Sequence, residues 1–100
     1  MEYDIGLVKD LPSGKMMGFT NDNKEFLVVN LKGKYYAIKN NCMHKGCKLS
    51  VGTLNGINIE CPCHGSAFNV KTGKAIKGPA KKSVPTFKIK TKDERIVLDY

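Results

Sequence analysis

All four cysteines and both histidines of the 100-residue chain lie in two short runs. The first run is Cys-Met-His-Lys-Gly-Cys at residues 42–47, and the second is Cys-Pro-Cys-His-Gly-Ser at residues 61–66. Thiolate and imidazole groups are common metal ligands, so mixed runs of this kind favour a fold that brings the two segments together. The side chains in these runs are the first candidates for the function.

The rest of the chain has the pattern of short β-strands. Strand-forming segments flank Lys32-Gly33 and Asp93-Glu94, a pattern typical of β-hairpins. No window of eleven or more residues shows a convincing helical period, so the sequence predicts an all-β sandwich or barrel with its motif residues in loops at 41–49 and 61–68. The expected strands are residues 15–20, 25–31, 34–40, 57–61, 86–92 and 95–100.

Length and hydropathy predict one domain over residues 1–100, made and kept in the cytoplasm. No run approaches the ~20 apolar residues that cross a bilayer, so we expect no membrane insertion. The first 15 residues contain early acidic side chains and no apolar segment, unlike a secretory signal peptide.

The charge of the chain is strongly basic and unevenly placed. Sixteen lysines and Arg95 oppose nine acidic residues, giving a net charge of +8, and Glu60 is the only acid between residues 26 and 92. The lysines serve either solubility or the attraction of an acidic partner. Nucleic-acid binding is disfavoured because proteins that recognise specific nucleic-acid sequences rely on arginine for bidentate contacts, and this chain has a single arginine.

Several chemistries use cysteine and histidine. Two disulfides would leave the histidines unexplained, and a catalytic Cys–His pair would need one nucleophile and one base. A structural Cys2His2 zinc site is a stronger alternative, although such sites usually take paired cysteines from one segment and paired histidines from another. One Cys and one His from each run suit a two-iron centre better.

Both runs resemble the cluster-binding boxes of Rieske [2Fe–2S] proteins. The resemblance continues through Ala67-Phe68, Thr72-Gly73 and Gly78-Pro79-Ala80, and it covers nearly the whole chain. It implies a Rieske-like fold of stacked antiparallel sheets. It also implies a small cluster-binding subdomain at about residues 41–82, formed by the two loops.

The resemblance also implies a ligand set for one [2Fe–2S] cluster. Cys42 and Cys61 would bind one iron, and His44 and His64 would bind the other. Thiolates stabilise ferric iron better than neutral imidazoles do, so the added electron is expected on the histidine-bound iron. The imidazoles would lie at the surface as the route for electrons.

Cys47 and Cys63 are the cysteines left over, one in each run. In the family, cysteines at these positions mark a subgroup in which a disulfide joins the two loops, whereas many Rieske ferredoxins lack the pair. Two buried free thiols are the alternative.

Further side chains are expected around the cluster. By resemblance, the Ser66 hydroxyl bonds a bridging sulfide, although a plain turn residue is the alternative. Phe68 replaces a tyrosine that bonds a cysteine sulfur in high-potential members, so that donor is missing. Lys45 stands where membrane-complex members have an apolar residue, and Pro79 belongs to a loop expected to close over the cluster.

The favoured function is a Rieske-type ferredoxin, a monomeric carrier that passes one electron from a reductase to an oxygenase or another acceptor. An oxygenase itself needs a separate two-His, one-carboxylate iron, and this chain has two histidines in all, so it is not expected to be an enzyme. A subunit of a respiratory or oxidase complex is the second interpretation, and a zinc-binding interaction module is the third. The lysines expected to ring the histidines and attract an acidic partner are Lys45, Lys48, Lys71, Lys74, Lys77, Lys81 and Lys82.

Overall fold

The computed structural model describes residues 2–41, 47–63, 65–78 and 82–100. Ten strands and two short 3-10 helices lie in these ranges. In chain order they are β1 (Glu2–Leu7), η1 (Val8–Asp10), β2 (Met16–Asn21), β3 (Lys24–Leu31), β4 (Lys34–Lys39), η2 (Leu49–Val51), β5 (Thr53–Asn55), β6 (Asn58–Glu60), β7 (Ala67–Asn69), β8 (Ala75–Lys77), β9 (Thr86–Lys92) and β10 (Arg95–Asp99).

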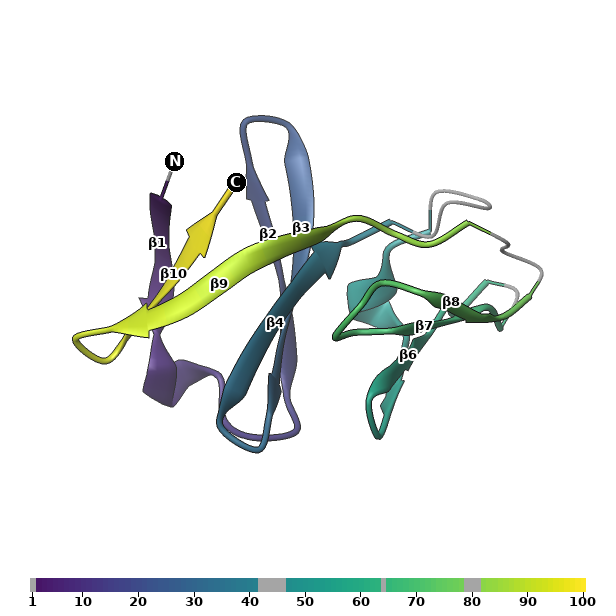
Figure 1. The fold of residues 1–100 in the computed structure, drawn as a ribbon, viewed down its shortest axis with the longest axis horizontal. Coiled ribbons are helices and arrows are strands. Elements are labelled where there is room, and N and C mark those ends of the chain that lie inside the picture. The colour runs from purple at the N-terminus through teal and green to yellow at the C-terminus, as the bar shows by residue number, and fades with distance from the viewer. Residues whose placement is uncertain (1, 42–46, 64, 79–81) are drawn as a thin grey trace.

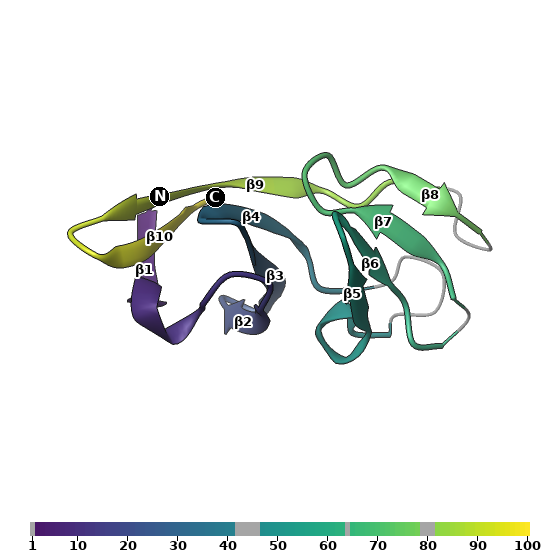
Figure 2. The same cartoon turned by 90° about the horizontal axis from the view of Figure 1, so that it is seen from below.

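The strands form two antiparallel sheets that lie side by side (Figure 1). The larger sheet has the order β1-β10-β9-β4-β3-β2 and curls around its own core (Figure 2). The smaller sheet has the order β5-β6-β7-β8. Its four strands come from one continuous segment inserted between β4 and β9, and the predicted all-β fold of two antiparallel sheets is confirmed.

Strand β3 is buried on both of its faces. Leu27 and Val29 point to one side and Phe26 and Val28 to the other, since successive side chains alternate across a strand, and all four are fully buried. This explains why the segment is continuously apolar rather than alternating with polar residues.

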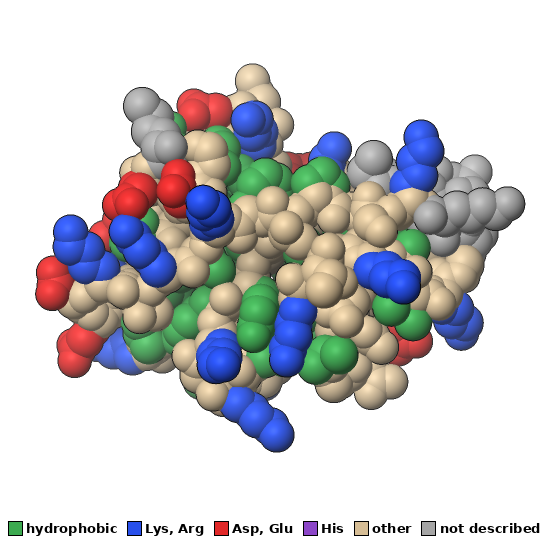
Figure 3. All heavy atoms as spheres, viewed as in Figure 1, with side chains coloured by type: hydrophobic (Ala, Val, Ile, Leu, Met, Phe, Trp, Pro, Cys, Tyr) green, Lys and Arg blue, Asp and Glu red, His purple; other side chains and the backbone are tan. Residues whose placement is uncertain are grey.

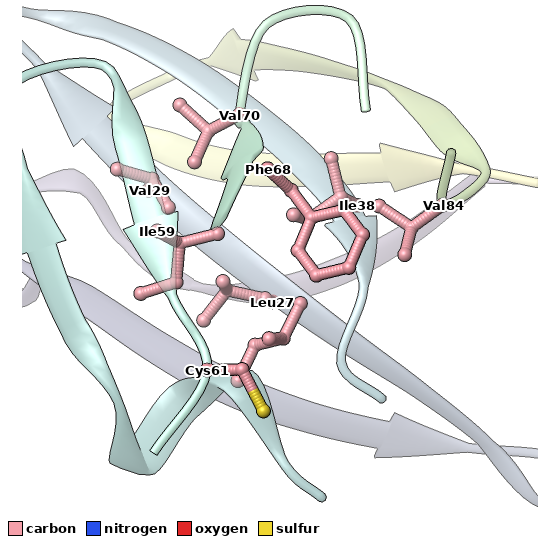
Figure 4. Close-up of a cluster of buried hydrophobic side chains, with 9 residues drawn as sticks. Leu27, Val29, Ile38, Ile59, Cys61, Phe68, Val70 and Val84 are labelled. Carbon is pink, nitrogen blue, oxygen red and sulfur yellow. The ribbon is translucent and has the colours of Figure 1, made fainter. Parts of the chain in front are cut away.

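Each face of β3 packs against a different hydrophobic core. Leu27 and Val29 belong to a cluster shared with the smaller sheet, which includes Ile59, Phe68 and Val70 (Figure 4). The opposite face belongs to a second cluster inside the curl of the larger sheet, with these members: Leu11, Phe26, Val28, Ala37, Ile96 and Leu98. The smaller sheet is thus held by apolar packing against the larger one.

The turns between the paired strands explain the register of the larger sheet. Lys32 and Gly33 have φ of 54° and 90°, and Asp93 and Glu94 have φ of 51° and 64°. Two successive positive φ values characterise the tight turns that match strand twist, so both predicted hairpins are confirmed. Leu31 therefore pairs with Lys34, and Phe26 with Lys39.

The smaller sheet differs from the sequence expectation. β5, β7 and β8 are three-residue strands that the sequence did not predict. Ala67 and Phe68 were expected in a loop but lie in β7, where Phe68 pairs with Ile59 and is fully buried. The second motif loop therefore ends at Ser66.

Among the described residues, helical structure is limited to two short segments. η1 and η2 have three residues each. None of the helices in the described part of the chain has the length and apolar character needed to span a bilayer.

Gly73 provides a test of the junction between the sheets. It has φ of +76°, and an alanine Cβ there would overlap the Val84 carbonyl oxygen. Gly33 has φ of +90° and open space around the same position, so it is a matched control. We expect Gly33→Ala to cost about 1–2 kcal/mol from backbone strain alone. Gly73→Ala should cost roughly 1–3 kcal/mol more in urea unfolding, and equal losses would show that the junction adapts freely.

Candidate metal centre

The first motif loop, residues 42–47, is closed at its base by backbone pairing. Asn41 and Lys48 form an isolated antiparallel bridge, and the Leu49 N–H donates to the Asn40 carbonyl at 3.2 Å. The buried Asn40 side chain adds two bonds to Ser50, accepting its N–H at 2.7 Å and donating to its hydroxyl at 3.0 Å. The chain thus enters and leaves the loop at a fixed position at the end of β4.

Glu25 contacts the residues on both sides of the first motif loop, Asn41 before it and Lys48 after it. Its carboxylate accepts a hydrogen bond from the Asn41 amide at 3.1 Å and pairs with the Lys48 ammonium at 3.0 Å. The Lys48 contact, followed by the Asn41 hydrogen bond, lowers the pKa of Glu25. The carboxylate therefore stays ionised well into the acidic range, and the contact would weaken only as pH falls through that lowered pKa.

The second motif loop is the connection between β6 and β7. Glu60 pairs with Ala67, so residues 61–66 form the end of a hairpin. The Cys61 N–H donates to the Ser66 carbonyl at 2.6 Å, and the Gly65 N–H donates to the Cys61 carbonyl at 3.1 Å. Cys61 and Ser66 are therefore held side by side at the start and end of this loop.

A disulfide joins the two loops. Cys47, at the end of the first loop, is bonded to Cys63 in the second, and their Cα atoms are 6.5 Å apart. The pairing that the resemblance implied is confirmed. The bond brings together segments that are 16 residues apart in the sequence.

Cys61 is the free thiol among the described cysteines. Its side chain is 3% exposed and lies at the end of the core between the sheets, in the same hydrophobic cluster as Leu27 and Ile59 (Figure 4). The sulfur atoms of Cys47, Cys61 and Cys63 lie within 4.8 Å of one another. These three do not form a metal site by themselves, because the two sulfurs of a disulfide are not thiolates. Cys61 is the one of the three that can donate a thiolate.

The other predicted cluster residues have different outcomes. Cys42, His44, Lys45, His64 and Pro79 lie outside the described residues. Ser66 and Phe68 are described, and both are fully buried next to the second loop. Phe68 also packs in the same apolar cluster as Cys61.

The lysines do not all gather around the motif loops. Lys77 pairs with Ala67, so it lies beside the end of the second loop, and Lys48 lies at the base of the first. Lys71 and Lys74 instead follow β7, at the opposite end of that strand. Lys71 and Lys74 therefore lie away from the second loop, and the ring of lysines around the histidines stays a prediction, because His44, His64, Lys45 and Lys81 lie outside the described residues.

The residues at the loop base were missed from the sequence. Glu25, Asn40, Asn41 and Ser50 carry no motif, and their role depends on the pairing of β3 with β4. The predicted hairpin turn at 32–33 could have revealed them, since counting residues outward from the turn places Glu25 opposite Asn40. The structure confirms this pair, because the Asn40 N–H donates to the Glu25 carbonyl at 3.0 Å. The strand register, once known, thus identifies Glu25 and Asn40 as residues that hold the base of the first motif loop.

The disulfide should contribute measurable stability. Replacing Cys47 and Cys63 together by Ser removes a constraint on the unfolded chain across a loop of about 15 residues, worth roughly 3 kcal/mol in the chain-entropy model. Urea unfolding of the cluster-free proteins should show this loss, and treatment of the unchanged protein with a reductant should reproduce it. An unchanged midpoint would mean that the loops are held together without the bond.

Comparisons with known proteins agree with this geometry. The family model described as the Rieske [2Fe-2S] domain matches residues 1–88. The ferredoxin component of the naphthalene 1,2-dioxygenase system of Pseudomonas aeruginosa is 34% identical over 96 residues, which are 96% of this chain and 92% of that protein.

Two solved structures are also similar to this chain. The ferredoxin of carbazole 1,9a-dioxygenase from Nocardioides aromaticivorans IC177 has a TM-score of 0.93 and 27% identity, over 98% of this chain and 96% of that one. A chain in a complex of reduced oxygenase and oxidised ferredoxin of carbazole 1,9a-dioxygenase has a TM-score of 0.93 and 28% identity, over 97% of this chain and 91% of that one.

The expected fold, cofactor and class of function are confirmed by these relatives. They are named as ferredoxin components, which are electron carriers rather than catalysts. The chain therefore belongs to the Rieske [2Fe–2S] family, with one [2Fe–2S] cluster as its cofactor and electron transfer as its function.

Proposed function

We propose that this protein is the ferredoxin component of an oxygenase system, passing single electrons from a reductase to the oxygenase. The relatives named above come from dioxygenase systems, and one of the similar structures is a complex between an oxygenase and its ferredoxin. We also propose that it acts as a cytoplasmic monomer. The whole chain would be one domain, with a cluster-binding part at about residues 41–82.

One observation carries the ligand assignment, the bond between Cys47 and Cys63. It places the two motif loops next to each other and removes two of the four cysteines from the possible ligands. Cys61 is left as a free, buried thiol beside the bond, which fits the donor set of a Rieske centre. We assign Cys42 and Cys61 to one iron, and His44 and His64 to the other.

The remaining side chains would tune and protect the cluster, which supplies one-electron redox chemistry when bound. The buried Ser66 stands at the closing end of the second loop, a position suited to a hydroxyl donor near sulfur. Phe68 is fully buried in the hydrophobic core that also contains Cys61, where it excludes water without offering a hydrogen bond. Lys45 and Pro79 complete the proposed surroundings.

Exchanging the proposed ligands tests the assignment. Cys61→Ser and His64→Ala should each abolish the visible and EPR spectrum of the Rieske cluster, because the chain has no further His and its two remaining cysteines are joined in the disulfide. The Cys47→Ser/Cys63→Ser double variant is the matched control and should keep the spectrum, since neither sulfur is a proposed ligand.

Two results would overturn the proposal. One is a wild-type protein that purifies colourless with zinc, which would favour the interaction-module alternative. The other is an unchanged spectrum in Cys61→Ser, which would show that the cluster ligands are other residues.

The charge around the motif loops should govern electron exchange with anions. Exposed Lys77 lies beside the second loop, so we expect oxidation of the reduced protein by ferricyanide to slow as salt rises. Oxidation by a cationic cobalt complex should instead accelerate. Lys77→Glu should weaken both trends in stopped-flow measurements.

Lys92→Glu is the matched control for this charge effect. Lys92 is also exposed, but it ends β9, at the turn farthest from the smaller sheet (Figure 1). Its reversal changes the net charge equally and should affect the rates less. If the rates depend neither on salt nor on either Lys→Glu substitution, the lysines contribute to solubility alone.

A further inference from the structure

An open groove lies between the two sheets, away from the motif loops. It has a volume of about 660 Å³, and the larger sheet and the smaller sheet each contribute one wall. Its apolar surface comes from Leu31, Tyr36, Leu54 and Ile57, of which the first three are half-buried and Ile57 is 43% exposed. None of its lining residues is buried, so its shape suits a segment of a protein better than an enclosed small molecule.

Backbone hydrogen bonds fix both walls. On the larger sheet, the Lys32 N–H donates to the Ser13 hydroxyl at 3.1 Å, and the Gly14 N–H donates to the Asn30 carbonyl at 2.8 Å. On the smaller sheet, the Val70 N–H donates to the Ile57 carbonyl at 2.9 Å. The groove is therefore formed before any partner binds, which lowers the ordering cost of binding.

The charge of the groove has one sign. Lys32, Lys34 and Lys71 are exposed along it, and no acidic residue is among the lining residues that the structure describes. The Lys71 ammonium lies 5.8 Å from the centre of the Tyr36 ring, across from one sheet to the other. Figure 3 shows green apolar and blue basic side chains next to one another in the lower middle of the molecule, between the two sheets.

This groove lies at the end of the smaller sheet opposite the motif loops. Ile57 precedes β6 and Cys61 follows it, so about 13 Å of strand separates the two. Lys71 and Ser66 similarly lie at opposite ends of β7. A partner in the groove would leave the surface around Lys77 accessible.

We propose that this groove is a second docking site, which takes an acidic segment of a redox partner with an apolar side chain between its carboxylates. The apolar side chain contacts Ile57 and Leu54, and the carboxylates meet Lys34 and Lys71. The proposal rests on the proposed function as an electron carrier with protein partners. It goes beyond that function by giving the carrier a docking site for a partner that lies away from the motif loops.

A labelled peptide provides the test. The probe is an eight-residue peptide with one Leu flanked on both sides by Glu residues, and its binding to the oxidised holo-protein is followed by fluorescence anisotropy. We expect saturable binding with a dissociation constant below about 1 mM. Lys34→Glu/Lys71→Glu, and separately Ile57→Glu, should weaken it roughly tenfold or more.

Matched controls separate the groove from general charge attraction. Lys77→Glu/Lys92→Glu lowers the net charge by the same four units, from +8 to +4, but changes no groove residue. Ile76→Glu alters another exposed isoleucine, 51% exposed, on β8. Both controls should bind the peptide within about twofold of the wild type, after allowance for salt. A peptide with Lys in place of Glu should not bind.

Four results would overturn the proposal. They are absence of saturable binding, equal weakening by the control variants, equal binding of the Lys peptide, and self-association of the wild type that Ile57→Glu abolishes. The last would identify a second copy of this chain as the occupant. The cluster spectrum of each variant is recorded in parallel, so a failure of the electron-carrier function appears as a lost spectrum and is distinguished from a failure at the groove.

Discussion

Burial of β3 on both faces connects the two halves of the molecule. Its side chains alternate between the core inside the larger sheet and the core shared with the smaller sheet. A fully buried Leu or Phe contributes on the order of 1.5–3 kcal/mol, so this strand alone supplies a large part of the cohesion of a small domain. The same strand also sets the register of β4, and through Glu25 it determines where the first motif loop begins.

The motif loops are held mainly by closures at their ends. The first is closed by the Asn41–Lys48 bridge, and the second by the bond from the Cys61 N–H to the Ser66 carbonyl. The Cys47–Cys63 disulfide then joins the two. These three closures restrict the ends of both loops and the distance between them, and so give the loops a rigid support. A carrier needs this arrangement, because its redox group must be close to partners yet keep its geometry.

The sequence predicted the fold class and the hairpins at residues 32–33 and 93–94 because these depend on local signals. The turn at Lys32-Gly33 and the alternation at 86–92 are visible in a few residues. The three-residue strands β5, β7 and β8 are too short to show a period, and pairing with their neighbours defines them. The cysteine pairing came from family resemblance, and the structure confirms it.

The charge distribution shows the limit of one-dimensional reasoning. Lys71 and Lys77 are six residues apart and look like one basic tract, yet the β7–β8 hairpin places them at opposite ends of the smaller sheet. Proximity in the sequence was a poor guide because the chain reverses between them. The groove has the same origin, since its walls come from turns far apart in the chain.

The pairing of Glu2 with Asp99 has a consequence for how such a protein can be combined with others. β1 and β10 are neighbours in the larger sheet, so both described ends of the chain lie together, on the side away from the smaller sheet (Figure 1). Adjacent ends tolerate insertion into a host polypeptide and circular permutation. The architecture is therefore modular: a further polypeptide can be joined at either end while it stays away from the smaller sheet and its motif loops.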